Sequence, residues 1–453
     1  MSRCAVDVVV PPGPFVERAR FVIEELLACL DLVRCPSLRI TYGTAYEEHP
    51  VPRTGSPWVH IQASPLAQDP RASLLRAIPY AGSVIPVIGS SGPDVIDGFN
   101  PVVIRFDLIA TAFFFLSGCD ISHRPPDPLG RRRYSGSVLA SLRPSVPPVN
   151  ALVGVLEAAI RHAGGNVAIL RDPMLCVSHD HDVTSRGVRG RIRGALSALG
   201  SPSDVLRYIA FGEDTLHALI EWEREHEIQP TTFAWAGHAR GALDWVGDTR
   251  ALLNSLRRSG FAEEIALHAS HYTEAEEWSL ERQVEALTSR IGIRPSGVRL
   301  HNLRYDIAHM SPQVEAARLA YDSSVAYPDA PEFATGFTYP HRLFSVEHNR
   351  PFEFIEVPLY LMDETFRKYL RARPLQMRDA ILEAGEVVAT WGGCLTILWH
   401  HHIGDDRFAR GYREAFQSAV VQLMMRGLPS VPLVRAAESR RAAYARIDVT
   451  VTS

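Results

Sequence analysis

An apolar segment, CVSHDHD, ends in two aspartates, Asp180 and Asp182. Side chains alternate along a β-strand, so the two carboxylates are expected on one face and His179 and His181 on the other. Two carboxylates that project together repel each other unless a cation or a shared proton lies between them. The pair is therefore a candidate for acid–base chemistry or for metal binding.

Three further strand-like segments, EIALHAS, SGVRLHN and CLTILWHHH, also end in ionisable side chains. In chain order these side chains are His268 and His271, then Arg299, His301 and Arg304, then His400. Carboxylate and imidazole ligands suit a divalent ion such as zinc. The remaining acids, imidazoles and guanidinium groups could transfer protons or stabilise an oxyanion.

The elements that must position these groups alternate regularly. Short apolar strands and amphipathic helices follow one another through residues 149–430, which predicts a parallel sheet closed, or nearly closed, as a barrel. In such folds the carboxyl ends of the strands meet at one edge, where function collects. Two expected helices carry start signals: Thr273 with Glu276 forms a capping-box pattern, and Ser311 precedes a proline. A further helix is expected near residues 249–258.

A proline-rich seam, RPSVPPVN, interrupts this pattern and predicts a domain boundary. We expect a mixed α/β domain over residues 1–148, the barrel over 149–430 and a C-terminal tail over 431–453. The N-terminal domain contains a buried helix in VIRFDLIATAFFFLS and is expected to form one wall of the cleft. Its arginine-rich segment DPLGRRRYSGS is interpreted as a solvated turn, with approach to an anionic group as the alternative.

Composition narrows the classes of function. The chain has 453 residues, 46% hydrophobic and 22% charged, with a net charge of −4, so no basic surface indicates nucleic-acid binding. The start shows no secretory signal, and no apolar run reaches the length of a membrane span. The six cysteines are scattered and are expected to be reduced and buried in a cytoplasmic protein.

The order of these motifs, from about residue 174 to 403, resembles that of the polysaccharide deacetylase (NodB-homology, carbohydrate esterase family 4) enzymes. The family's opening Thr-Phe-Asp-Asp motif looks like residues 178–182, and its closing Leu-x-His motif is similar to Leu398-Trp399-His400. EIALHASHY matches the first histidine of the His-Ser/Thr-x-x-x-His motif, but Tyr272 occupies the position of the second. FDLIATAFFFLSG and VPLYLMDETF are similar to segments of a subgroup that has an additional N-terminal domain.

The resemblance implies a distorted (β/α) barrel that removes acetyl groups from N-acetylated sugars or glycoconjugates with a bound divalent metal. It implies Asp180 as general base and His400 as general acid. The implied metal ligands are Asp182 and His268, with a third ligand from His301 or His271. Supporting roles fall to Arg299 or Arg304, which would keep Asp180 ionised, and to Asp322, Trp399 and Tyr305 near the substrate.

Two other functions stay open on the sequence. A non-catalytic relative could bind a glycan or a partner in the same cleft, which the displaced second histidine favours. An amidohydrolase could cleave a non-sugar amide, because the same site acts on any accessible acyl–nitrogen bond. The sequence leaves the oligomeric state open.

Overall fold

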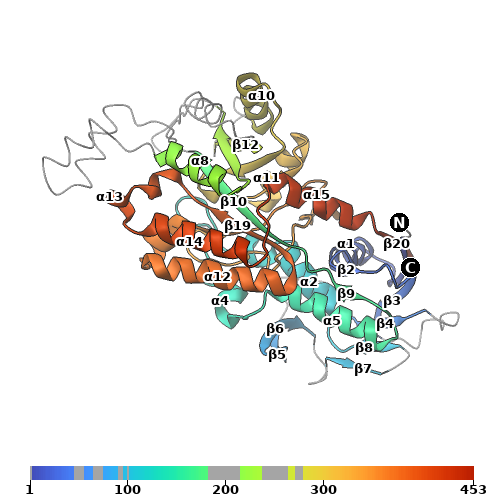
Figure 1. Ribbon diagram of the computed structural model, residues 1–453. Coiled ribbons are helices and arrows are strands. Elements are labelled where there is room, and N and C mark those ends of the chain that lie inside the picture. The colour runs from blue at the N-terminus through green and yellow to red at the C-terminus, as the bar shows by residue number, and fades with distance from the viewer. Residues whose placement is uncertain are drawn as a thin grey trace, which may run out of the picture.

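The computed structural model describes residues 3–44, 56–64, 75–89, 95–98, 101–181, 215–236, 264–270 and 279–452. Two sheets organise these residues into two lobes that pack side by side (Figure 1). Asp182, His271, the expected capping box at Thr273 and the helix expected near residues 249–258 lie outside the described residues.

The larger sheet has eight strands in the order β17-β14-β13-β12-β11-β10-β19-β18, and every pairing in it is parallel. Its edge strands β17 and β18 are separated in the chain by only two residues, so the sheet curls on itself. The predicted distorted (β/α) barrel is confirmed. Its strands are β10 (Pro173–His181), β11 (Thr231–Trp235), β12 (Glu264–Ala269), β13 (Gly297–Leu300), β14 (Tyr321–Asp322), β17 (Ile355–Glu356), β18 (Leu359–Met362) and β19 (Gly393–Leu398).

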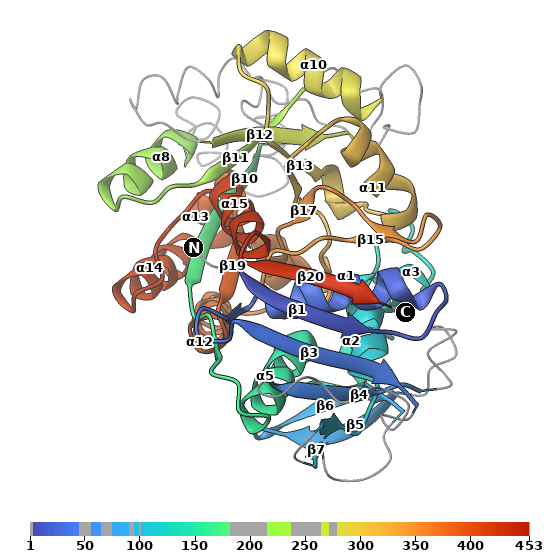
Figure 2. The same cartoon turned by 90° about the vertical axis from the view of Figure 1, so that its right-hand side faces the viewer.

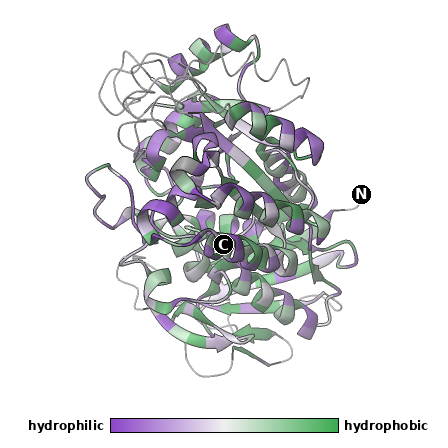
Figure 3. Ribbon diagram, turned by 60° about the vertical axis from the view of Figure 1, so that its left-hand side comes forward, coloured by the Kyte–Doolittle hydropathy of each residue, from purple (hydrophilic) through white to green (hydrophobic). Residues whose placement is uncertain are grey.

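Amphipathic helices cover the outside of this sheet, and their ribbons carry polar and apolar colours in alternation (Figure 3). They are α8 (Thr215–Glu225), α10 (Leu280–Ile291), α11 (Ile307–Ala316), α12 (Pro374–Trp391), α13 (Asp406–Ala409), α14 (Tyr412–Met425) and α15 (Leu433–Tyr444). In the described ranges none of the helices is long and apolar enough to cross a bilayer. All six cysteines are buried, and no disulfide joins any two of them.

One expected helix start is corrected by the structure. Helix α11 begins after Asp306, whose carboxylate accepts hydrogen bonds from the backbone N–H groups of Ala308 and His309. Ser311 lies inside the helix, and its hydroxyl contacts that of Tyr305 instead of capping a helix end. The earlier aspartate supplies the cap, so Pro312 sits within the helix and not at its first position.

The smaller sheet belongs to the N-terminal domain and has the order β20-β1-β3-β4-β8-β7. Its last member in the chain, β20, pairs in parallel with β1 at the opposite end of the sequence (Figure 2). The segment that we expected to be a tail therefore completes this sheet. The strands are β1 (Cys4–Val9), β3 (Ser37–Gly43), β4 (Trp58–Gln62), β7 (Ile96–Asp97), β8 (Val102–Ile104) and β20 (Ile447–Thr452).

Short antiparallel pairs of strands also lie outside the two large sheets: β2 (Leu30–Asp31) with β9 (Ala168–Ile169), β5 (Leu75–Tyr80) with β6 (Ser83–Ile88), and β15 (Phe344–Ser345) with β16 (Arg350–Pro351).

The expected domain boundary near residue 148 coincides with the start of a helix. The prolines of the seam start helix α5 (Pro148–His162), since proline fits the first position of a helix. This helix packs against the N-terminal sheet and against helices α1 (Phe15–Leu27) and α2 (Leu108–Leu116). The short helix α3 (Cys119–Ser122) contacts α2, and α4 (Val138–Leu142) contacts β6. Strand β9, which follows this helix, pairs with β2, so the chain still contacts its N-terminal part at Ile169.

A buried ion-pair cluster joins the two lobes. The Glu25 carboxylate of α1 accepts hydrogen bonds from Arg440 Nη2 at 2.7 Å, Arg342 Nε at 2.8 Å and the Tyr444 hydroxyl at 2.6 Å. Burial alone would raise the pKa of Glu25, but the two guanidinium groups outweigh burial and lower the pKa. Arg440 belongs to α15 and Arg342 precedes β15, so one carboxylate holds three segments together.

Glu25→Gln should therefore destabilise the protein strongly, since it leaves two guanidinium groups buried with less compensating charge. We expect the free energy of unfolding, measured by urea denaturation, to fall by about 3–5 kcal/mol. Glu17→Gln is the matched control, because Glu17 lies on the same helix in an exposed pair with Arg20. That pair should contribute about 0–1 kcal/mol. Equal losses in the two variants would contradict the assignment.

Candidate active site

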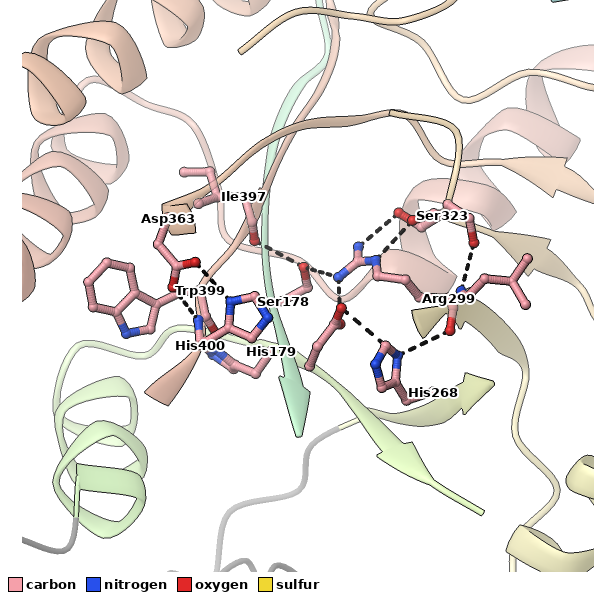
Figure 4. Close-up of polar contacts among 12 residues, drawn as sticks. Ser178, His179, His268, Arg299, Ser323, Asp363, Ile397, Trp399 and His400 are labelled. Carbon is pink, nitrogen blue, oxygen red and sulfur yellow. Dashed lines mark hydrogen bonds and ion pairs between the residues drawn. The ribbon is translucent and has the colours of Figure 1, made fainter. Parts of the chain in front are cut away.

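Asp180 is anchored inside the barrel by a buried arginine. Arg299 Nη1 lies 3.0 Å from Asp180 Oδ1 and 2.8 Å from Ser178 Oγ, which joins β13 to β10. The same guanidinium donates to the backbone oxygen and to the hydroxyl of Ser323, each at 2.9 Å (Figure 4). Its Cζ atom lies 4.2 Å from the centre of the Phe233 ring. Arg299 has no exposed surface. It therefore compensates the charge of Asp180 in a fixed geometry.

The expected alternation of side chains along β10 is observed. Ser178 and Asp180 both point toward Arg299, whereas His179 points the other way. His179 Nε2 lies 2.6 Å from Glu223 Oε1 on helix α8, and its Nδ1 lies 2.8 Å from the backbone oxygen of Trp399. The His179–Glu223 pair is thus a structural contact on the outer face of the sheet.

His268 and His301 lie beside Asp180. The His268 Nδ1 atom is 3.1 Å from the backbone oxygen of Arg299 and 3.9 Å from Asp180 Oδ2. A carbonyl oxygen only accepts, so Nδ1 carries a proton, and in the neutral form of the ring the lone pair is on Nε2. The ring centres of His268 and His301 are 5.4 Å apart, and Trp235 contacts both. This orientation by a backbone carbonyl is the arrangement that metal-binding imidazoles usually have.

His400 is oriented by Asp363, a residue to which the sequence analysis assigned no role. One carboxylate oxygen of Asp363 accepts the backbone N–H of His400 at 2.6 Å, and the other lies 2.8 Å from His400 Nδ1 (Figure 4). Asp363 is fully buried. It directly follows strand β18, so the rule applied to the other strand ends would have identified it.

These groups meet in one cavity of about 210 Å³ at the carboxyl ends of the strands. Asp180, His268, His301 and His400 all line it, and Arg131 of the N-terminal domain forms part of its wall. The expected contribution of that domain to the cleft is therefore observed. The other lining residues are Asn302, Leu303, Met362, Glu364, Lys368, Tyr369, Leu398 and His402.

The metal-ligand set stays a prediction, since both Asp182 and His271 lie outside the described residues. Within the part of the chain that the structure describes, no three His, Cys, Asp or Glu side chains are arranged to hold a metal ion. His268 and His301 fit a divalent metal in chemical type, because imidazole is a common zinc ligand.

Arg299, and not Arg304, pairs with Asp180. Arg304 lines a neighbouring cavity of about 260 Å³ with Asn302 and the loop at Gly130. Gly130 has a φ of +82°, and a Cβ added there would lie 2.5 Å from Arg304 Nε. A glycine is thus required where the N-terminal loop passes over this arginine.

The three residues expected near the substrate are buried away from the cavity. Trp399 faces the opposite side of β19 from His400 and stacks on Phe416, with ring centres 4.4 Å apart. The Tyr305 hydroxyl contacts Ser311 in the core. The Asp322 carboxyl group, which bonds the backbone and hydroxyl of Ser324, is fully buried beside Glu356, and burial raises the pKa of both acids. Strand alternation excludes Trp399 from the cavity, and core packing excludes the other two.

Comparison with known proteins finds matches among solved structures. No family model and no curated protein matches the sequence. A putative polysaccharide deacetylase from Mycobacterium smegmatis is 15% identical, with a TM-score of 0.40 over 62% of this chain and 94% of that chain. Puue allantoinase is 15% identical, with a TM-score of 0.42 over 60% of this chain and 91% of its own. A probable polysaccharide deacetylase from Pseudomonas aeruginosa PAO1 is 14% identical, with a TM-score of 0.40 over 60% and 92%.

Asp363→Asn should change the tautomer of His400. Aspartate accepts both the backbone N–H and Nδ1–H of His400, but asparagine offers one acceptor oxygen and a donor amide. The backbone N–H cannot reverse its role, so the ring must, and its proton should move to Nε2. Nitrogen-15 NMR of labelled histidine, assigned with a His400→Gln sample, would detect the Nε2–H form. A His400 spectrum identical to that of the wild type would contradict this assignment.

Proposed function

We propose that the protein is a hydrolase of acyl–nitrogen bonds that removes an N-acetyl or other N-acyl group from a sugar or glycoconjugate. The observation that carries this proposal is that one cavity holds an acid and a base candidate, each with its own buried partner. Asp180 is paired with Arg299, and His400 is paired with Asp363. Amide hydrolysis needs both functions, because water must lose a proton and the departing nitrogen must gain one.

The roles of Asp180 and His400 follow from the side-chain atom of each that is not bound to its buried partner. Arg299 Nη1 binds Asp180 Oδ1, so Oδ2 is the oxygen that would accept a proton from water as the water attacks the acyl carbon. The Nδ1 atom of His400 is committed to Asp363. In the doubly protonated form of the ring, Nε2 would therefore donate its proton to the departing nitrogen, which leaves the ring neutral with its remaining proton on Nδ1. The acyl–nitrogen bond breaks, giving a carboxylic acid and an amine.

We further propose a divalent metal, zinc, as cofactor. His268 and His301 would supply two imidazole ligands, with Asp182 as the carboxylate and His271 as the alternative to His301. A bound zinc ion polarises an acyl oxygen and lowers the pKa of coordinated water. Arg299 would keep the ring of His268 in place through its backbone oxygen, which accepts Nδ1–H.

Asp180→Asn should reduce turnover by about 10²–10⁴-fold, because it removes the proton acceptor. The measurement is acetate release from a panel of N-acetylated sugars and N-acetylated non-sugar amines. Glu223→Gln is the matched control. It weakens the buried pair between Glu223 of α8 and His179, which lies on the same strand as Asp180 but points away from the cavity. We expect it to retain most of the activity.

Two outcomes would contradict the proposal. Full turnover in Asp180→Asn would refute the role of Asp180. Absence of acetate release across the panel by the metal-supplemented wild type would favour the alternative of a glycan- or partner-binding protein. Release from the non-sugar amines alone would replace the sugar substrate with another amide.

The proposed cofactor is tested by measuring the zinc content of the purified protein. Purified wild-type protein should hold about one equivalent of zinc by elemental analysis, and His268→Ala should lose most of it, because a zinc site of this class has only three protein ligands. His309→Ala is the control, since His309 is largely exposed and lies on α11 away from the cavity. A metal-free wild type that releases acetate would refute the cofactor while leaving the acid–base roles intact.

A further inference from the structure

Three cationic side chains surround one tyrosine at the mouth of the cavity. The Lys368 Nζ atom is 5.8 Å from the centre of the Tyr369 ring, and the Cζ atoms of Arg131 and Arg133 are 5.5 and 5.8 Å from it. These distances are within the range of cation–π attraction. Arg131, Lys368 and Tyr369 line the same cavity as Asp180 and His400. We call these three cations and their tyrosine the Tyr369 cluster.

The Tyr369 cluster carries more positive than negative charge. One carboxylate, Asp127, lies against it: Arg131 Nη2 and Nε are 2.7 and 3.0 Å from Asp127 Oδ2, and Arg133 Nε is 3.5 Å away. Burial opposes ionisation of Asp127, but hydrogen bonds from Arg131 and the backbone outweigh it and lower its pKa to about 2. Among the residues that the structure describes, three cations therefore face a single carboxylate, which leaves two positive charges in excess.

The other acids of the cavity do not cancel this excess. Glu364 binds Arg367 Nη2 through both oxygens, at 2.7 and 2.9 Å, and Asp180 is paired with Arg299. Lys368 forms no ion pair with any residue of the described ranges. An anion that enters the cavity would thus meet a net attraction at its mouth.

Both segments that carry these cations have a defined local structure. Arg131 is nearly buried, and the Asp127 carboxylate that holds it also accepts the backbone N–H groups of Leu129 and Arg131. Lys368 and Tyr369 belong to a π-helix, Thr365–Leu370, a rare form that occurs frequently at functional sites. Lys368 is also the single lysine of the chain, in which arginine supplies every other basic side chain.

We propose that the Tyr369 cluster is a phosphoryl-binding subsite and that the substrate is an N-acyl sugar bearing a phosphoryl group. This inference rests on the proposed function and adds to it the substrate class. Two guanidinium groups and an ammonium group supply several donors for phosphate oxygens, and their excess charge matches that of a phosphate dianion. The N-terminal domain then has a function in recognition, since it contributes two of the three cations.

The test uses ligands without an amide, so that binding is measured in the absence of hydrolysis. Isothermal titration calorimetry should show that glucose 1-phosphate binds at least about tenfold more tightly than glucose, as expected for charge-assisted hydrogen bonds. Lys368→Gln and Arg133→Gln should each remove about tenfold of the affinity for glucose 1-phosphate and leave the affinity for glucose unchanged. Lys368→Arg should restore most of the binding. Arg34→Gln, on the exposed surface of the N-terminal domain, controls for net charge.

The phosphoryl-binding subsite and the proposed hydrolase activity can fail separately. Comparison of the affinities for UDP-glucose and glucose 1-phosphate shows whether the subsite prefers a diphosphate or a monophosphate. Binding of either ligand more tightly than glucose supports the subsite. Glucuronate tests a carboxylate: binding as tight as that of glucose 1-phosphate would overturn the phosphoryl assignment. Equal affinities for glucose and glucose 1-phosphate would overturn the subsite, whatever acetate release shows. Phosphoryl binding without acetate release from N-acetylglucosamine 1-phosphate would refute the hydrolase and retain the subsite.

Discussion

A guanidinium group with no exposed surface must have its charge and its N–H groups satisfied inside the protein. Arg299 meets this requirement through Ser178, Asp180 and Ser323, and it lies over the face of Phe233. An unpaired charge in the same place would cost several kcal/mol, so the ends of β10, β13 and β14 are fixed relative to one another. The position of Asp180 in the cavity follows from that constraint.

The candidate general acid, His400, is oriented by a different residue, Asp363. His400 follows β19 and Asp363 follows β18, which are neighbours in the sheet, and Asp363 fixes both the backbone and the ring of His400. Strand β10, which carries Asp180, is the other neighbour of β19. Parallel pairing brings the carboxyl ends of these strands to one edge, so Asp180 and His400, which have different buried partners, line the same cavity.

The N-terminal domain is part of this arrangement. The chain leaves that domain after β9, forms the barrel, and returns through α15 to add β20 beside β1. Glu25 holds the return segment in place, while the loop at Asp127 reaches into the wall of the cavity. The N-terminal domain, which the sequence analysis expected to form one wall of the cleft, thus contributes Arg131 to the candidate active site.

The sequence by itself determined the parallel barrel and the order of strand ends that bear Asp, His and Arg. It also determined which side of β10 carries Asp180 and which carries His179, because alternation along a strand depends only on local backbone geometry. Only the tertiary structure decided that Asp363 orients His400 across 37 positions of sequence, that Trp399 stacks on Phe416, that Arg131 lines the cavity and that β20 joins the N-terminal sheet. Local patterns place Asp363 at a strand end and turn Trp399 away from His400, but the partner that each side chain meets depends on which surfaces come together when distant segments pack.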